Sequence, residues 1–340
     1  MKRLSFLNKI IFVVNSLAAF LLLLSYILPF VPPRKFALLS VVSLGVPFLI
    51  LINILFLVYW LLRVKKQLML SLVVLLLGYN YLGALYKFSS SKKIEDSDNI
   101  SVMSFNVRLF NRFEWLPSKT VREDIINFIN EEQPDILCLQ EYTRGLPIKL
   151  EGYNDFNARY NRNAKGGQSI FSKYPIVNYG SLEFTDTKNN VIYADIARGN
   201  DTIRVYNMHL QSLGIIPDVD TFKKESSESL INRTASTFRA QQDQVEKFLE
   251  HKANCPYKVI VAGDFNNTAY SYTYNAIKGD LIDTFEEGGN GFGRTYDFKF
   301  FPVRIDFILV DEAFTTNGFN AYDDIILSDH YPIKATLKLH

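Results

Sequence analysis

Three long stretches without a charged residue stand near the start of the chain. They cover residues 10–33, 36–62 and 67–86. Each stretch reaches the ~20 residues that an α-helix needs to cross ~30 Å of hydrocarbon. The pattern therefore predicts that residues 1–88 form a membrane anchor with three transmembrane helices.

A cleaved signal peptide is the alternative interpretation of the first stretch, because Lys2, Arg3 and Lys9 place basic residues ahead of an apolar centre. No cleavage site with small residues follows this centre, and the next two apolar stretches have no explanation in a soluble protein. The membrane anchor is therefore the favoured interpretation.

Basic residues in the short flanks of these stretches predict the orientation of the anchor. One side carries Lys2, Arg3, Lys9, Arg63, Lys65 and Lys66, and the other carries Arg34, Lys35, Lys87, Lys92 and Lys93. Cytoplasmic flanks carry the excess of Lys and Arg. The narrow margin favours a cytoplasmic N-terminus and an extracytoplasmic location for everything after residue 90.

From residue 100 onward, short apolar runs alternate with polar segments. A polar connector at residues 89–99 (SSSKKIEDSDN) separates this part from the anchor. Runs with the pattern of β-strands lie at residues 100–106, 136–139, 193–196, 203–208, 259–262, 304–310 and 333–338. Amphipathic helices are predicted between Ser118 and Pro134 and at residues 239–251. The pattern predicts a strand-rich α/β domain over residues 100–340, which is long enough to bury a sizeable core.

One segment of this domain, residues 213–238, lacks a clear apolar period and is rich in Ser and acidic residues. It follows closely on His209. Long loops in compact domains are either functional or mobile. Two interpretations therefore stay open, a disordered excursion and a flap over a site near His209.

The charge of the predicted domain disfavours nucleic acid as its partner. The whole chain has a formal net charge of +2, but residues 100–340 carry 26 Lys and Arg against 32 Asp and Glu. Non-specific binding of nucleic acid depends on cationic side chains that neutralise phosphates, and a mildly acidic domain offers few of them.

The two cysteines, Cys138 and Cys255, imply neither a disulfide framework nor a Cys-based metal site. The sequence predicts no protein partner.

Six short polar clusters in the predicted domain lie beside apolar, strand-like runs. In chain order they are Ser104-Phe105-Asn106, Leu139-Gln140-Glu141, Asn207-Met208-His209, Gly263-Asp264-Phe265-Asn266, Arg304-Ile305-Asp306 and Ser328-Asp329-His330. Strand ends are where α/β proteins commonly place their sites. The side chains have the types that bind metal, transfer protons and contact phosphate, so together they predict a hydrolytic site for phosphate esters.

Two carboxylates of these clusters are candidate metal ligands. Glu141 follows the apolar run at residues 136–139, and a carboxylate at such a strand end is a suitable hard-oxygen ligand for Mg²⁺ or Mn²⁺. Asp329 is the candidate for a second metal carboxylate. Taken alone, Glu141 could also be a strand-end carboxylate that simply meets solvent.

Asp264 and Asn266 are two residues apart, so on an extended chain their side chains face the same way. A carboxylate and an amide aimed at one point could hold an attacking water and a phosphate oxygen. The alternative is an ordinary turn, because Gly, Asp and Asn all favour turns.

Asp306 lies in an otherwise apolar strand, where an ionised group needs a partner. His330 is the obvious one, because a carboxylate that holds one imidazole nitrogen makes the other a better general base or acid. The alternative is a core histidine that is satisfied by hydrogen bonds. His209 ends a strand and could donate to a phosphate.

These clusters, in this order, resemble the endonuclease/exonuclease/phosphatase superfamily, which includes DNase-I-like nucleases, neutral sphingomyelinases and inositol-polyphosphate phosphatases. The resemblance covers residues 100–339 and includes the stretch Gly-Gly-Gln-Ser-Ile-Phe-Ser that ends at Ser172. It implies a four-layer α/β/β/α sandwich with the site at one end of two packed sheets. It also implies that Asn106 and Glu141 hold a divalent metal, usually Mg²⁺, together with Asp329.

The resemblance implies a role for the remaining candidates as well. Asp264 and Asn266 would orient the nucleophile and the phosphate. His330, paired with Asp306, would activate water or stabilise the phosphate, and His209 would contact the phosphate from the other side. These five residues are the predicted catalytic group.

The sequence therefore predicts a membrane-anchored, Mg²⁺-dependent phosphoesterase, with Mn²⁺ as an alternative metal. A phosphodiesterase that acts on lipid headgroups or other small phosphate esters outside the cytoplasm is the favoured function. An extracytoplasmic nuclease is the first alternative, and a non-catalytic binding module with the same fold is the second. The sequence does not separate monoesters from diesters.

Overall fold

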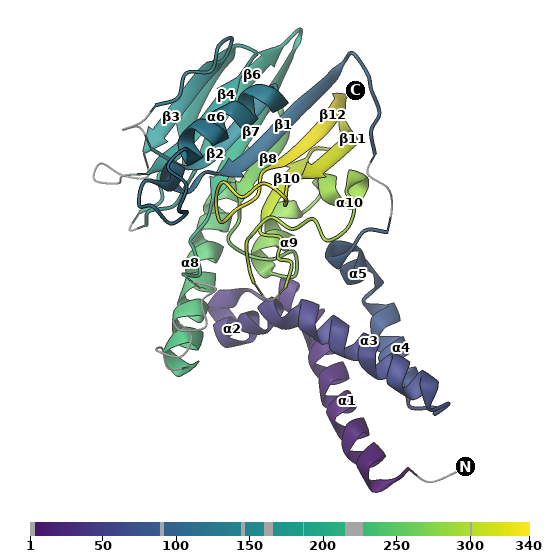
Figure 1. Ribbon diagram of the computed structural model, residues 1–340. Helices are drawn as coiled ribbons and strands as arrows, with labels where there is room; N and C mark the ends of the chain where they lie inside the picture. Colours follow the sequence, from purple (N-terminus) through teal and green to yellow (C-terminus); the bar gives the residue numbers. More distant parts are fainter. Residues whose placement is uncertain are drawn as a thin grey trace.

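Two sheets of six strands each form the upper part of the protein in Figure 1, and the N-terminal helices lie below them. The computed structural model describes residues 4–88, 92–143, 147–159, 166–185, 187–214, 227–299 and 301–340. The first sheet has the order β11 (Phe314–Ala321), β12 (Ile333–Leu339), β1 (Asn99–Asn106), β2 (Ile136–Tyr142), β4 (Gly167–Ser172) and β3 (Asn154–Arg159). The second has the order β5 (Ile176–Ser181), β6 (Asn190–Arg198), β7 (Asp201–His209), β8 (Lys258–Asp264), β10 (Asp306–Val310) and β9 (Ile282–Asp283). Only β1 with β2 and β7 with β8 are parallel among these neighbouring pairs.

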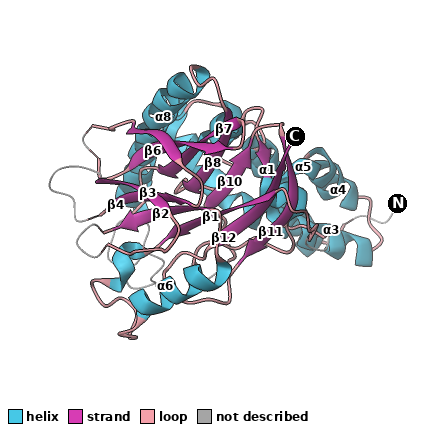
Figure 2. Ribbon diagram, turned by 90° about the horizontal axis from the view of Figure 1, so that it is seen from above, coloured by secondary structure: helices cyan, strands magenta, loops and turns pink. Residues whose placement is uncertain are grey.

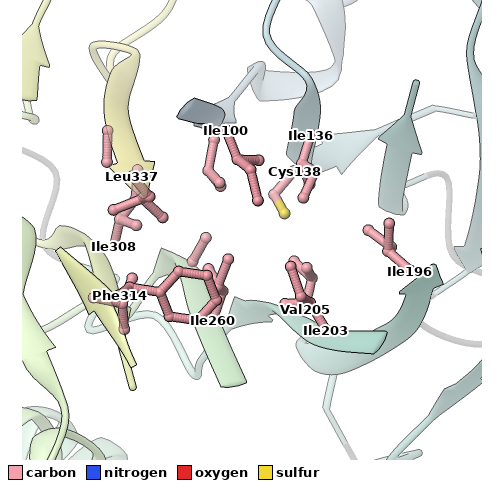
Figure 3. Packing of buried hydrophobic residues seen from close by; sticks show 14 of the residues in the cluster. Ile100, Ile136, Cys138, Ile196, Ile203, Val205, Ile260, Ile308, Phe314 and Leu337 are labelled. Atoms are coloured by element: carbon pink, nitrogen blue, oxygen red, sulfur yellow. The ribbon is translucent and has the colours of Figure 1, made fainter. Parts of the chain in front are cut away.

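The inner faces of the two sheets pack against each other through apolar side chains. Ile136 and Cys138 are two residues apart on β2 and therefore point to the same face, as Ile203 and Val205 do on β7. Figure 3 shows these side chains between the two sheets. The main core of the protein therefore lies between the sheets.

Helices cover the outer faces of both sheets (Figure 2). α6 (Val121–Glu132) lies on the first sheet and buries Ile125 and Ile129 there. α8 (Ser227–Ala253) and α9 (Tyr272–Lys278) lie on the second sheet, where Phe248 of α8 is fully buried. A short helix, α10 (Thr284–Gly288), and a 3-10 turn at Arg108–Asn111 complete this part. The predicted four-layer α/β/β/α sandwich is confirmed.

The prediction from the apolar pattern misses the four strands at the sheet edges, β3, β5, β9 and β11, and also the buried strand β4. β3 and β5 are largely exposed or only half-buried along their length. An edge strand that packs on little apolar surface has no reason to alternate apolar and polar residues. Its sequence therefore carries little signal.

Part of the segment predicted to be a loop is helical. α8 begins at Ser227, so residues 227–238 are its first turns. The interpretation as a disordered excursion is wrong for this part, and the flap over the site stays a prediction. The buried positions here include Thr234, Ala235 and Thr237, which are small or polar and give only a weak apolar period. Residues 215–226 of the same segment lie outside the described residues.

The N-terminal helices are α1 (Phe6–Ser25), α2 (Pro33–Ser40), α3 (Val46–Leu62), α4 (Leu68–Leu77) and α5 (Tyr79–Leu85), with 3-10 turns at Leu28–Phe30 and Val41–Gly45. Two helical stretches, Phe6–Phe30 and Pro33–Leu62, are long and apolar enough to cross a membrane. The third predicted stretch is bent by 75° between α4 and α5, and becomes a third span only if this pair is counted together. The bend falls at Gly78, where a Cβ would lie 2.0 Å from the hydroxyl oxygen of Tyr26.

Buried polar side chains connect the N-terminal helices. Asn15 of α1 donates to Ser71 of α4 (2.7 Å) and accepts from the indole of Trp60 on α3 (2.9 Å). Ser71 in turn donates to Asn53 of α3 (3.3 Å). Hydrogen bonds of this kind hold helices together in apolar surroundings.

The same helices are attached to the sandwich. The guanidinium of Arg34, in α2, pairs with Asp243 and with Glu246 (2.8 Å) on α8. Asn275 of α9 donates to the carbonyl oxygen of Pro29 (3.2 Å). α2 therefore lies beside α8, beneath the second sheet in Figure 1.

Candidate active site

Two acidic side chains and one imidazole lie in a row where three neighbouring strands of the second sheet meet the same end of the sheet. The strand register pairs His209 of β7 with Asp264 of β8, and Asp264 with Asp306 of β10. Each is at most 5% exposed. Pairing across three neighbouring strands therefore sets the spacing of two carboxyl groups and one imidazole.

Asp264 is the centre of this group. Its Oδ2 accepts hydrogen bonds from Asn106 Nδ2 (3.1 Å) and Asn266 Nδ2 (3.0 Å). The Nε2 atoms of His209 and His330 lie 3.7 Å and 3.6 Å from the same oxygen. Because Asn106 ends β1 in the other sheet, the site is built across the ends of both sheets.

Asp306 holds the imidazole of His330 in place. His330 Nδ1 lies 3.0 Å and 3.2 Å from the two carboxylate oxygens of Asp306, and both residues are buried. A proton on Nδ1 shared with this carboxylate fixes the tautomer. Nε2 is then directed towards Asp264.

The two histidines have opposite charge behaviour. Burial lowers the pKa of His330, but the carboxylates of Asp306 and Asp264 outweigh burial and raise this pKa to about 10. Burial, and then repulsion from His330, lowers the pKa of His209 to about 3. Burial raises the pKa of Asp264 to about 7, against the opposing charge of His330. At neutral pH, His330 is therefore the cationic imidazole and His209 the neutral one.

Two special backbone conformations position Asp264 and Asn266. Gly263 has φ +143°, and a Cβ at this position would lie 2.1 Å from the carbonyl oxygen of Met208. Only glycine lets β7 and β8 approach so closely here. Asn266 has φ +50° and also donates to the carbonyl oxygen of Leu210 (3.0 Å). The Gly-Asp-x-Asn segment is thus a turn and a polar site at once.

Glu141 reaches the site because β2 is irregular at this point. The register of β2 with β4 shifts between Gln140 and Tyr142, and Glu141 has φ +50°. A bulge re-aims a side chain. Glu141 accordingly lines a pocket, whereas Gln140 and Tyr142 are buried in the sheet.

The donor set at Glu141 suits a divalent cation. Burial, and then repulsion from Asp329, raises the pKa of Glu141, and a hydrogen bond with Asn106 opposes this rise. Two neighbouring carboxylates, Glu141 and Asp329, are the hard oxygen ligands that Mg²⁺ and Mn²⁺ prefer. The amide oxygen of Asn106 accepts a hydrogen bond from the backbone N–H of Arg108 (3.1 Å). A bound cation would remove the repulsion between the carboxylates. The residues present therefore fit such a metal.

Asp264, Asp306 and His330 form a second group whose ligand atoms lie within 4.8 Å of one another. In this group, Nδ1 of His330 and a carboxylate oxygen of Asp306 are already hydrogen-bonded to each other. A cation here would have to displace that bond. A metal ion at this group would therefore compete with the pairing of Asp306 and His330.

A pocket with a volume of about 330 Å³ opens onto the site. Six predicted site residues line it: Glu141, His209, Asp264, Asn266, Asp329 and His330. The other two candidates do not line the pocket but contact residues that do. Asn106 is hydrogen-bonded to Asp264, and Asp306 is hydrogen-bonded to His330. The structure therefore brings all eight candidate residues together.

Two residues of the site have no place in the predicted set. The ring of Tyr296 lies 4.9 Å from that of His330 and lines the pocket. Arg108 Nε lies 3.3 Å from Asp329 Oδ2. Arg108 follows Asn106 by two residues, so its position after a strand end was a usable signal, whereas Tyr296 lies in a segment without a pattern.

Family comparison agrees with this geometry. A model described as the Endonuclease/Exonuclease/phosphatase family matches residues 103–330. The chain belongs to this family. The predicted resemblance is confirmed, and members of the family are generally phosphoesterases that use a divalent metal. A second model, described as a Domain of unknown function (DUF8431), matches residues 8–85, and no curated protein matches the chain.

Solved structures of the family share the fold. TDP2 of D. rerio, complexed with single strand DNA product, is 16% identical with a TM-score of 0.55, over 72% of this chain and 100% of that one. The catalytic domain of human Nocturnin with bound sulfate anion is 17% identical with a TM-score of 0.55, over 73% and 97%. An endonuclease/exonuclease/phosphatase from Beutenbergia cavernae is 17% identical with a TM-score of 0.51, over 71% and 72%. At these identities the likeness shows the fold alone.

Proposed function

We propose that this protein is a membrane-anchored, divalent-metal-dependent phosphodiesterase that hydrolyses lipid headgroups or other small phosphate esters. One observation carries the proposal. The Asp264 carboxylate, the Asp306–His330 pair and the oxygen ligands at Glu141 and Asp329 converge on one pocket. This arrangement supplies a base, a cation and a metal site within reach of one phosphate.

In this proposal, residues 1–88 form the membrane anchor, 89–99 the connector and 100–340 the catalytic domain. The outward surface of the N-terminal helices supports the anchor, since it carries large apolar side chains such as Leu17 (59% exposed) and Leu55 (59% exposed). Apolar patches of this extent mark contact with a membrane or a partner. The two or three apolar spans support a multi-pass anchor. With α4 and α5 counted as the third span, the count of basic flanking residues favours a catalytic domain outside the cytoplasm.

The protein side chains have defined tasks in the proposed reaction. Asp264 and Asn266 position the attacking water, and Asp264 accepts its proton as the new oxygen–phosphorus bond forms and the bond to the leaving oxygen breaks. His330, held by Asp306, donates Nε2–H to a phosphate oxygen that gains negative charge. His209 contacts the phosphate from the side of the site opposite His330, with Asp264 between the two histidines.

Asn106, Glu141 and Asp329 would hold the metal ion. When bound, the ion supplies positive charge that stabilises the phosphate oxygens in the transition state. Arg108, beside Asp329, adds a further positive charge at the same end of the pocket. This concentration of positive charge matches a phosphate group.

The balance of charge favours lipid or small substrates over nucleic acid. The domain from residue 100 is mildly acidic, with 26 Lys and Arg against 32 Asp and Glu. Extended nucleic-acid backbones need many cationic contacts outside the site. A nuclease with the same chemistry is the competing function.

The test uses the full-length protein in lipid nanodiscs with bis(4-nitrophenyl) phosphate and Mg²⁺, Mn²⁺ or EDTA. We expect metal-dependent release of 4-nitrophenolate, which Asp264→Asn lowers by about 10²-fold or more. Asp280→Asn is the matched control, since Asp280 is exposed and distant in sequence from every site residue. If wild type and Asp264→Asn are equally inert with several divalent metals, the fold serves as a non-catalytic binding module.

A substrate panel then separates the competing functions. Phospholipid vesicles, sphingolipid vesicles and single-stranded DNA are offered to the same preparation at equal phosphodiester concentration. Faster cleavage of lipid is expected. Much faster cleavage of DNA would establish the nuclease instead.

A further inference from the structure

The pocket above the catalytic residues has a second, apolar end that the N-terminal helices build. Leu44 precedes α3, Pro47 and Phe48 lie in its first turn, and Ala84 and Leu85 end α5. All five line the same pocket as Asp264 and His330. The wall of the site is therefore shared between the catalytic domain and helices that lie more than 100 residues earlier than most of the catalytic group.

Aromatic contacts connect this wall to the catalytic domain. The ring of Phe48 lies 5.0 Å from that of Phe301, and Phe301 lies 6.2 Å from Phe292. Tyr86, directly after α5, lies 4.8 Å from Phe292. These rings form an apolar border on the side of the pocket that faces the helices.

Hydrogen bonds hold the helices at the pocket. The backbones of Lys87 and Gly291 exchange two hydrogen bonds (2.8 Å and 3.0 Å). Tyr270, which lines the pocket, donates to the carbonyl oxygen of Tyr81 (3.3 Å) and stacks on its ring at 5.8 Å. The apolar wall is therefore fixed relative to the catalytic residues.

The apolar wall continues into a surface suited to lipid. α3 carries no charged residue from Val46 to Leu62. Its exposed side chains include Phe48 at 41%, Leu51 at 44%, Leu55 at 59% and Leu62 at 78%. A bilayer that surrounds this helix would therefore extend to the edge of the pocket at Phe48.

We propose that the substrate is a membrane-resident phosphate ester whose hydrocarbon chain lies against the wall formed by Phe48 and Leu85 while its phosphate reaches Asp264 and His330. The N-terminal helices then determine specificity as well as location. This proposal rests on the proposed phosphoesterase function and narrows its substrate class to phosphate esters that carry a hydrocarbon chain. It explains why apolar and charged groups share one pocket, because such a lipid carries both.

The test is a chain-length series of 4-nitrophenyl alkyl phosphates with methyl, butyl and octyl groups, used below their critical micelle concentrations. The full-length protein is held in lipid nanodiscs, and kcat/KM is measured from released 4-nitrophenolate. Each buried methylene stabilises the bound state enough for about a two- to fourfold gain. We therefore expect kcat/KM to rise from methyl to octyl in the wild type.

Variants separate the pocket wall from general affinity for lipid. Phe48→Ser is expected to lower the octyl-to-methyl ratio of kcat/KM at least fivefold. Phe20→Ser is the matched control, since Phe20 is an exposed phenylalanine (61%) on α1 outside the pocket, and the ratio should stay as in wild type. Leu85→Phe places a larger side chain in the apolar end of the pocket, so kcat/KM should become higher for the butyl than for the octyl substrate. This second variant keeps the proposal testable if Phe48→Ser does not fold.

The outcomes distinguish this proposal from the proposed function. Equal kcat/KM for all chains in the wild type overturns the lipid substrate but leaves a phosphodiesterase. An equal fall of the ratio in Phe20→Ser and Phe48→Ser also overturns it, because membrane partition then explains the preference. Failure to cleave any member of the series removes the phosphodiesterase function itself.

Discussion

Asn207 joins the two sheets directly beside the active site, which makes Asn207→Ala a sharp test of how the sandwich is held. Its Nδ2 donates to the carbonyl oxygens of Leu139 and Ser169, both at 2.9 Å. Its Oδ1 accepts from Gln140 Nε2 (2.8 Å) and Gln168 Nε2 (3.3 Å). Asn207 lies on β7 of the second sheet and all four partners lie on β2 and β4 of the first. Asn207 is fully buried, so water cannot take over these bonds.

The magnitude follows from these four bonds. A hydrogen bond contributes about 1 kcal/mol net, and a buried partner left without one costs more. Asn207→Ala should therefore lower the free energy of unfolding by about 4 kcal/mol. For a domain of this size, 1 kcal/mol corresponds to roughly 2–4 °C, so the melting temperature should fall by roughly 8–16 °C.

The assay is thermal unfolding of the full-length protein in nanodiscs, followed by tryptophan and tyrosine fluorescence, with Asn178→Ala as control. Asn178 lies exposed on the edge strand β5 and donates one hydrogen bond, to Asp195 (2.9 Å). The control should melt within a few degrees of wild type. If Asn207→Ala melts as high as this control, the bonds between the sheets contribute nothing measurable, and the reasoning fails.

Three further changes test individual parts of the site. Asp306→Asn should lower kcat by about 10²–10⁴-fold with little change in KM, because His330 loses the carboxylate that orients it; kinetics with bis(4-nitrophenyl) phosphate would check this, and a wild-type kcat would contradict it. Gly263→Ala should destabilise the protein by more than about 2 kcal/mol, because its Cβ meets the Met208 carbonyl oxygen at 2.1 Å in a left-handed backbone; a wild-type melting temperature would refute this. EDTA should abolish hydrolysis, and Glu141→Gln should raise the Mg²⁺ concentration for half-maximal rate at least ~10-fold; a titration that matches wild type would exclude Glu141 as a ligand.

The predicted core of the fold came from strands that are buried on both faces. Runs such as residues 136–139 and 259–262 are apolar throughout because one face packs on the other sheet and the other on a helix. Most candidate site residues came from the same signal, since Asn106, Glu141, His209 and Asp264 end or follow such a run, whereas Asp306 begins β10 and His330 precedes β12. Exposed edge strands such as β5 and the small buried residues of α8 near Thr234 leave no comparable pattern.

The orientation of individual site residues could not come from the sequence. Glu141 faces the pocket only because β2 is irregular between Gln140 and Tyr142, and alternation along a regular strand gives no hint of this. Tyr296 meets His330 through a segment with no periodicity, which is placed by backbone bonds to neighbouring loops. Such contacts depend on tertiary packing that local patterns do not encode.

The docking of the N-terminal helices is the least predictable feature, and it changes what the pocket is. Two family models match neighbouring parts of the chain, residues 8–85 and 103–330, with no overlap. The pocket nevertheless needs both parts, since Phe48 and Leu85 belong to the first and Asp264 to the second. An isolated catalytic part would keep the groups that act on phosphate but would lose its apolar wall. Helices that only tether a domain need no side chains in its active site. The presence of Phe48 and Leu85 in the pocket is therefore the strongest structural reason to connect the N-terminal helices with substrate selection.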